Sequence, residues 1–238
     1  MIEYQKVVVY LKKHGYDGQE NVADHWFSNH EKLGRLVNQR FLHHSQIFDL
    51  QVRWRSAIGK ACVEALKSYI EKLQEQARLE SSRRYQLGDL NLAFAKLDLN
   101  DFAFHFNGQE YNIKAVVDAF PTSQIGGWHD LRGIPLDGIR LVNSILIGLN
   151  FSSSSFVGAS FQQVRIAHCN FVFANFDNAR FEAVKHDQET ALSGISVRGA
   201  FINAVELNDQ VVSSPMQIRE IGYFEVIAVA TFVRTLLA

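Results

Sequence analysis

The sequence contains few of the residues that build cysteine-based sites. Its 238 residues include two cysteines, Cys62 and Cys169, and three prolines. Two cysteines are too few for a disulfide framework or for a cysteine-based metal site, and they are typical of a reducing compartment. We therefore expect a cytoplasmic protein.

Long apolar runs are also missing. The chain has no stretch of about 18 uninterrupted apolar residues, so a membrane-spanning helix is not evident. The apolar stretch from Val7 to Leu11 is short and lacks a small-residue cleavage site, so we expect no secretory signal.

The motifs that carry common chemistry are missing as well. The chain has no glycine-rich phosphate loop and no glycine-flanked nucleophilic serine. Among nine histidines, His25 and His30 lie five apart and His43 and His44 are adjacent, and neither spacing places two imidazoles on one helical face. We predict that the chain is not an enzyme and has no catalytic residue, no cofactor and no metal site.

Phenylalanine, in contrast, is abundant, with 18 residues. Large apolar residues recur at a strict spacing of five, at Leu131, Leu136, Leu141, Leu146, Phe151, Phe156, Phe161, Ile166, Phe171, Phe176 and Phe181. A second row, two residues earlier, is small or aliphatic: Ile134, Ile139, Ser144, Leu149, Ser154, Ala159, Val164, Cys169, Ala174 and Ala179. A period of five suits neither an α-helix nor a flat strand, so the chain must turn at regular intervals. Four such sides make one coil of about 20 residues, and coils stack at about 4.8 Å.

Four segments of this ladder resemble the pentapeptide-repeat family, whose unit is a small residue, a polar residue, Leu or Phe, and two variable residues. The segments are Ala159-Ser160-Phe161, Cys169-Asn170-Phe171, Ala174-Asn175-Phe176 and Ala179-Arg180-Phe181. The resemblance implies a right-handed quadrilateral β-helix. The predicted fold class is therefore mainly β, with an N-terminal α-helical region and a C-terminal α-helix flanking the β-helix.

The repeat frame also predicts local features. After His186 the register slips by one residue and resumes at Ile195-Ser196-Val197, which indicates a loop or bulge near residues 186–191. Within the frame Cys169 points inward and His168 outward, so these neighbours cannot act as a catalytic pair.

An earlier echo of the repeat precedes the main ladder. Leu90-Asn91-Leu92, Ala95-Lys96-Leu97 and Asn100-Asp101-Phe102 share its phase and form either a first coil or an ordinary strand. The following segment, Phe104 to Tyr111, is predicted to be a hairpin, because its Asn-Gly pair suits a two-residue turn. We expect it to belong to an insertion near residues 104–130.

Helices are predicted on both flanks. An apolar stripe favours a helix from about Arg55 to Arg84, and similar spacing favours another from Glu31 to His43. These form an antiparallel pair or small bundle, with a coiled-coil dimer as the alternative. At the other end, Ser214-Pro215 is a typical helix start. The following helix is apolar over more than half its circumference, so it must be buried against another surface. We expect it to cap the β-helix, to form a dimer or to contact a membrane.

These observations divide the chain into residues 1–85, 86–211 and 212–238. The net charge of −1 is unevenly distributed, with +4 over residues 1–85 (14 − 10), −5 over 86–210 (8 − 13) and 0 over the remainder (2 − 2). Direct nucleic-acid binding is disfavoured, because the basic excess of the first segment is small and spread out.

Three functions remain open. The first is a non-enzymatic scaffold for protein partners of unknown identity. Some proteins of bacterial pathogens with a similar layout are secreted effectors, so the resemblance implies an effector-like role. The second is DNA mimicry, because the family includes quinolone-resistance proteins that occupy the DNA site of topoisomerases. A coil advancing about 4.8 Å would need close to three net negative charges for such mimicry. Four or five coils would then need about a dozen, whereas residues 86–210 have a net charge of −5. The third is a membrane-associated regulatory module that uses the C-terminal helix.

Overall fold

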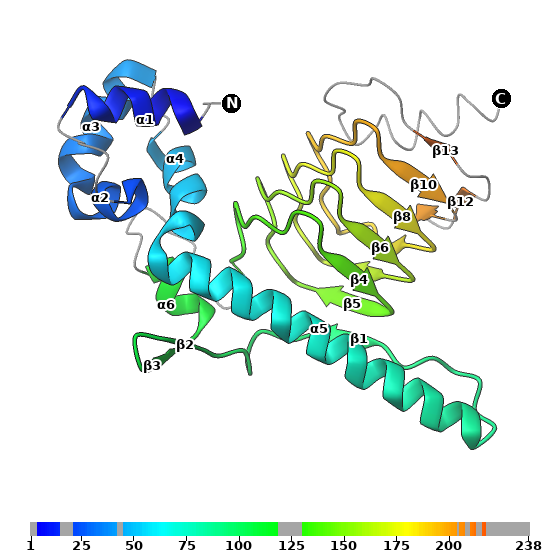
Figure 1. The fold of residues 1–238 in the computed structure, drawn as a ribbon. Coiled ribbons are helices and arrows are strands. Elements are labelled where there is room, and N and C mark those ends of the chain that lie inside the picture. Colours follow the sequence, from blue (N-terminus) through cyan, green and yellow to red (C-terminus); the bar gives the residue numbers. More distant parts are fainter. Residues whose placement is uncertain are drawn as a thin grey trace. The chain divides into compact units, whose positions relative to one another are not determined.

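The computed structural model describes residues 4–14, 21–41, 45–118, 130–203, 205–207, 210–212 and 216–217. They belong to two compact units, one drawn from residues 1–65 and 102–130 and the other from residues 66–101 and 131–238. Helix α5 (Ala57–Gln86) runs from the first unit into the second (Figure 1). The domain boundaries at residues 85 and 211 stay predictions.

The first unit is helical. Its helices are α1 (Tyr4–Lys12), α2 (Val22–Ser28), α3 (His30–Phe41), α4 (Ser45–Val52), the short 3-10 helix η1 (Arg53–Arg55), the start of α5, and α6 (Ile113–Asp118). The apolar faces of α1, α2, α3 and α4 share a core that includes Val7, Leu11, Trp26, Leu33, Val37 and Phe48. The buried Trp26 indole donates a hydrogen bond to the Asp49 carboxylate, which satisfies both polar groups within this core. The predicted N-terminal helical region is confirmed.

The predicted hairpin is present in the same unit. Strands β2 (Phe104–Phe106) and β3 (Gln109–Tyr111) pair in antiparallel register, with Phe104 opposite Tyr111. The turn residues Asn107 and Gly108 have φ angles of 50° and 77°, the left-handed conformation that this two-residue turn requires.

The second unit is a β-solenoid of about three turns, drawn as successive rungs in Figure 1. One sheet stacks β4 (Arg140–Val142), β6 (Ser160–Gln162), β8 (Arg180–Glu182) and β10 (Phe201–Asn203) in parallel. A second sheet stacks β1 (Ala95–Leu97), β5 (Ser144–Ile147), β7 (Arg165–Ala167), β9 (Lys185–His186) and β11 (Val205–Leu207). Arg140 pairs with Ser160 and Ser160 with Arg180, so one turn takes 20 residues, as the spacing predicts.

The solenoid interior is filled by the two predicted rows of side chains. Because one turn takes 20 residues, every fourth large residue lies above its equivalent. Phe151 stacks on Phe171 with ring centroids 5.2 Å apart, and Phe156 stacks on Phe176 at 5.0 Å. The small residues of the second row, including Ala159 and Ala174, are buried beside them. The excess of phenylalanine is thus explained by a close-packed aromatic core.

The corners of the solenoid explain its five-residue period. The residue two positions after each large inward residue is left-handed, and such residues include Asn143, Ser153, Gln163, His168, Phe173, Asn178 and Ala183, with φ angles of 46–60°. This conformation costs a residue other than glycine about 1–2 kcal/mol. Parallel pairing between turns therefore holds these residues in place.

The predicted register slip is confirmed. Asn150 pairs with Asn170 twenty residues later, but Asn170 pairs with Ala191, which lies twenty-one residues later. The extra residue lies between His186 and Ala191, since Ile166 still pairs with His186.

The earlier echo of the repeat forms part of the solenoid. Strand β1 pairs in parallel with β5, with Ala95 opposite Ser144 and Leu97 opposite Leu146. Its first segment does not take part in the core, because Leu90 is 79% exposed and Leu92 is 45% exposed. The segment from Leu90 to Phe102 therefore contributes one strand, β1, to the second sheet of the solenoid. The prediction of an earlier repeat is confirmed only for Ala95 to Leu97.

Both open ends of the solenoid are covered. At the first turn, the side-chain amide of Gln74 on α5 donates to the Arg140 carbonyl (2.9 Å) and accepts from the Val142 amide (2.7 Å), which satisfies the free edge of β4. At the last turn, β12 (Gln210–Val212) and β13 (Met216–Gln217) pair in antiparallel register with β11 and β10.

The predicted C-terminal helix needs a correction at its start. Met216 and Gln217 form a strand on the edge of β10, because their backbone groups pair with Ile202 and Phe201. The remainder of that prediction, residues 218–238, lies outside the described residues. Among the helices that the structure describes, none combines the length and apolar character needed to cross a bilayer.

Candidate functional site

Among the described residues, both cysteines and the central serine of the solenoid interior are buried and unreactive. Cys169 is 1% exposed and His168 is 61% exposed, so the two side chains point in opposite directions, as predicted. Burial raises the pKa of Cys62 to about 12 and that of Cys169 to about 11, which leaves both thiols protonated at neutral pH. Ser154 also points inward, where its hydroxyl donates to the Leu131 carbonyl at 3.0 Å. The outward positions are therefore the ones that are available for function.

On one side of the solenoid, the outward residues of three successive turns carry no charged side chain, and we call this surface the neutral face; Arg132 lies on the same side in the first turn. The neutral face comprises Asn150, Ser152, Ser153, Asn170, Val172, Phe173, Ala191, Ser193 and Gly194. The chain holds this surface rigidly, because the Asn150 and Asn170 side chains accept hydrogen bonds from the backbone amides of Ser152 and Val172. Charge depletion and apolar content are typical of the centre of a protein–protein interface.

Phe173 is the most exposed large apolar residue on the neutral face, at 57%. It occupies a left-handed corner, with a φ of 60°. Backbone hydrogen bonds place it in a column with Gly133, Ser153 and Gly194, which occupy the same corner in the other turns. Its ring lies against Gly194, where a Cβ atom would be only 2.5 Å from the ring.

Two other sides of the solenoid are charged, and two of their carboxylates are paired with arginines. Arg180 donates to Glu182 at 2.5 Å, and this hydrogen bond lowers the pKa of Glu182. Arg198 donates to Asp177 at 2.6 and 3.0 Å. Burial alone would raise the pKa of Asp177, but the hydrogen bonds from Arg198 and from Ser196 lower it overall. These pairs link residues of the outer surface, and they leave no continuous acidic stripe among the described outward residues.

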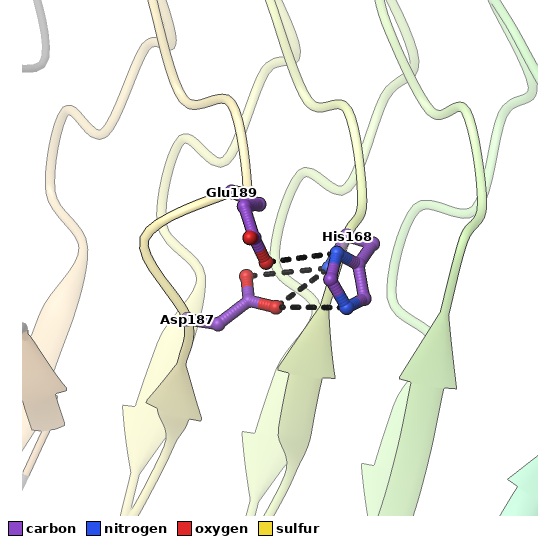
Figure 2. A group of neighbouring side chains, drawn as sticks. All are labelled: His168, Asp187 and Glu189. Carbon is purple, nitrogen blue, oxygen red and sulfur yellow. Dashed lines mark hydrogen bonds and ion pairs between the residues drawn. The ribbon is translucent and has the colours of Figure 1, made fainter.

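His168, Asp187 and Glu189 gather at the register slip (Figure 2). The distance from His168 Nδ1 to a Glu189 carboxylate oxygen is 2.9 Å, and that from His168 Nε2 to an Asp187 oxygen is 3.8 Å. The sequence prediction of no metal site did not consider this set, because the slip hides which of the residues 187–190 lies beside His168.

A comparison with known protein families identifies the same repeat. Residues 144–182 match the model for pentapeptide repeats, in eight copies. This segment is built from pentapeptide repeats. No curated protein matches the chain.

Solved structures, two of which are pentapeptide repeat proteins, are similar to part of this chain. One from the Arabidopsis thaliana thylakoid lumen is 21% identical over 34% of this chain and 62% of its own, with a TM-score of 0.16. Rfr23 from the cyanobacterium Cyanothece is 28% identical over 29% of this chain and 52% of its own, with a TM-score of 0.13. QnrB1, a plasmid-mediated fluoroquinolone resistance protein, is 20% identical over 34% of this chain and 58% of its own, with a TM-score of 0.16. The chain spans less than two thirds of the length of each.

Beside the pentapeptide-repeat solenoid lies a cleft of about 560 Å³ that the sequence did not predict. It separates α5 from the first turn, and its charged lining residues are Lys67, Glu71, Glu75, Arg78, Asp137 and Arg140. Three acidic and three basic groups give this cleft no net charge. Gln74, which forms hydrogen bonds with the edge of β4, also lines the cleft. We therefore interpret the cleft as a gap that remains where α5 covers the first turn, and not as a binding site.

Proposed function

We propose that this protein is a non-enzymatic scaffold that binds a protein partner through the neutral face of its pentapeptide-repeat solenoid. Phe173 is the observation that carries the proposal. Its left-handed backbone costs about 1–2 kcal/mol, and its ring is 57% exposed. Glycine occupies the same corner at positions 133 and 194 without that cost. The stability of the solenoid therefore does not explain a phenylalanine at this corner.

Burial of Phe173 by a bound partner would offset the conformational cost of its left-handed backbone. Complete burial of a phenylalanine side chain contributes about 1.5–3 kcal/mol relative to exposure, so covering the exposed part of this ring would contribute about 1–2 kcal/mol. The surrounding Ser, Asn and Val side chains carry no charge that the partner would have to desolvate. Large apolar side chains in such surroundings often supply most of the binding free energy of an interface.

The proposal extends to features that resemblance implies. It includes the right-handed, four-sided form of the coil, a cytoplasmic location and an effector-like role in bacteria. Two free, buried cysteines support a reducing location. The combination of a helical unit with a pentapeptide-repeat solenoid supports an effector-like role only by its similarity of layout.

The charges favour this proposal over DNA mimicry. A mimic of duplex DNA needs about one negative charge per 1.7 Å. Here Asp177 and Glu182 are paired with arginines, and β7 and β9 place Arg165 and Lys185 in adjacent outward positions. The membrane-associated alternative depends on the C-terminal helix, which lies outside the described residues and stays a prediction.

Site-specific photocrosslinking tests the scaffold proposal. The photoreactive analogue p-benzoylphenylalanine would replace Phe173 in the full-length chain, expressed in cells. The control would carry it at Ile147, which is 41% exposed and lies in β5, away from the column of Phe173. We expect a defined protein adduct from position 173 and none from position 147. Equal labelling from both positions, or no adduct from position 173, would contradict the proposal.

A further inference from the structure

The cluster at the register slip joins two successive turns of the solenoid. His168 follows β7, whereas Asp187 and Glu189 follow β9 in the next turn (Figure 2). One imidazole nitrogen and two carboxylate oxygens lie within 4.8 Å of one another. His168 and Glu189 are exposed, so water and ions have access to the cluster.

The inserted residue explains why these side chains meet. In the preceding turn, the Gly148 amide donates to the Ala167 carbonyl at 3.0 Å, which is the regular pattern between turns. At the slip, the His168 amide instead donates to the Asp187 carboxylate at 3.0 and 3.2 Å. The side chain of Asp187 therefore replaces a backbone carbonyl, and this bond brings it next to His168.

Asp187 is held in place from its other side as well. Thr190 donates to its carboxylate through the backbone amide at 2.9 Å and through the hydroxyl at 2.7 Å. Carboxylates that bind metal ions are commonly held in this way by hydrogen bonds from neighbouring groups.

The donor set indicates the class of ion. Calcium and magnesium prefer oxygen ligands, whereas one imidazole with two carboxylates suits zinc and related transition metals. Zinc is tetrahedral and lies about 2.0–2.2 Å from nitrogen and oxygen ligands, so two ligand atoms of one ion are about 3.3–3.6 Å apart. Shifts of about 1–1.5 Å in the exposed side chains of His168 and Glu189 would bring the three ligand atoms, which lie within 4.8 Å of one another, to that separation.

We propose that His168, Asp187 and Glu189 bind a divalent transition-metal ion, with Zn²⁺ as the best fit. The ion would link two turns of the solenoid across the inserted residue, where the regular pairing of the backbone is interrupted. Water would complete its coordination. The inference is independent of the proposed partner-binding role of the neutral face.

Calorimetric titration of the full-length chain with Zn²⁺ tests the site. His168→Asn removes the imidazole but preserves the left-handed corner, because asparagine tolerates this conformation. Glu189→Gln removes a ligand charge from an exposed residue. A matched control is His105→Asn, since His105 forms a similar exposed pair with Glu110 at 3.9 Å but has no third ligand among the residues that the structure describes.

We expect the unmodified chain and His105→Asn to bind one more equivalent of Zn²⁺ than His168→Asn. Glu189→Gln should weaken binding at that site by about tenfold or more, and Ca²⁺ in excess should not compete. Circular dichroism without metal should be the same for all four proteins, which separates loss of a ligand from loss of the fold. Identical Zn²⁺ isotherms for the unmodified chain and His168→Asn would overturn the proposal and leave an ordinary ion pair.

Discussion

Replacing Phe156 with alanine removes the ring at the centre of the aromatic stack in the solenoid. Phe156 is fully buried, and its ring is parallel to that of Phe176, with an interplanar angle of 8° and a centroid distance of 5.0 Å. It also packs edge-on against Phe151 at 5.3 Å. Large-to-small changes of this kind cost about 3–5 kcal/mol, because the transfer free energy is lost and the cavity does not fully collapse. Total stabilities are about 5–15 kcal/mol, so the loss would be a large fraction.

The matched control is Phe173→Ala, which removes the same side chain from an exposed position. Urea unfolding followed by far-ultraviolet circular dichroism would give the change in the free energy of unfolding. Hydrogen exchange of peptides from residues 151–181 would locate it in the solenoid. Trp26 and Trp54 lie in the helical unit, so their fluorescence would report that unit separately. A loss below about 1 kcal/mol for Phe156→Ala, or equal losses for the two variants, would refute the packing account.

Three further predictions concern the ends, the charges and the thiols. Gln74→Ala should lower the free energy of unfolding by about 1–3 kcal/mol in urea denaturation, because it exposes the edge of β4, whereas the exposed Gln76→Ala should have almost no effect. Asp177→Asn should destabilise the chain at pH 7. Because the pKa of Asp177 is lowered in the folded state, its contribution is present above the unfolded value of about 3.9 and is lost as the pH falls through the folded value. The difference between the variant and the unmodified chain, measured by urea unfolding at several pH values, should therefore shrink in acid. Neither Cys62 nor Cys169 should react with maleimide at neutral pH until urea unfolds its own unit, and rapid labelling of the folded chain would contradict their burial.

The repeat was predictable because each inward position has its own chemical requirement. A large apolar side chain is needed at every fifth residue, and a small one two positions earlier, so the spacing of Phe151, Phe156 and Phe161 already specifies the coil. The Asn107-Gly108 turn was predictable for a similar reason, since few residue pairs adopt its backbone angles. Local requirements of this kind leave a direct trace in the sequence.

Features that depend on contacts between distant residues were not predictable. Gln74 is one of several glutamines on α5, and only its hydrogen bonds to β4 distinguish it. The strand at Met216 was predicted as the start of a helix, because Ser-Pro is a typical helix start and the pairing with β10 has no local signal. The meeting of His168 with Asp187 and Glu189 was not predictable, because both carboxylates follow a slip in the register. The positive φ positions of the repeat frame, however, would have singled out Phe173 as an unusual corner.

The most direct test of the scaffold proposal is the affinity of the partner captured at position 173. That partner would be purified and its dissociation constant measured against the unmodified chain, Phe173→Ser and Ile147→Ser. Serine already occupies the corresponding corner at position 153, so Phe173→Ser should preserve the solenoid. We expect roughly tenfold or greater weakening for Phe173→Ser, equivalent to about 1.4 kcal/mol or more, and unchanged affinity for Ile147→Ser. Unchanged affinity for Phe173→Ser would contradict the claim that the neutral face binds the partner.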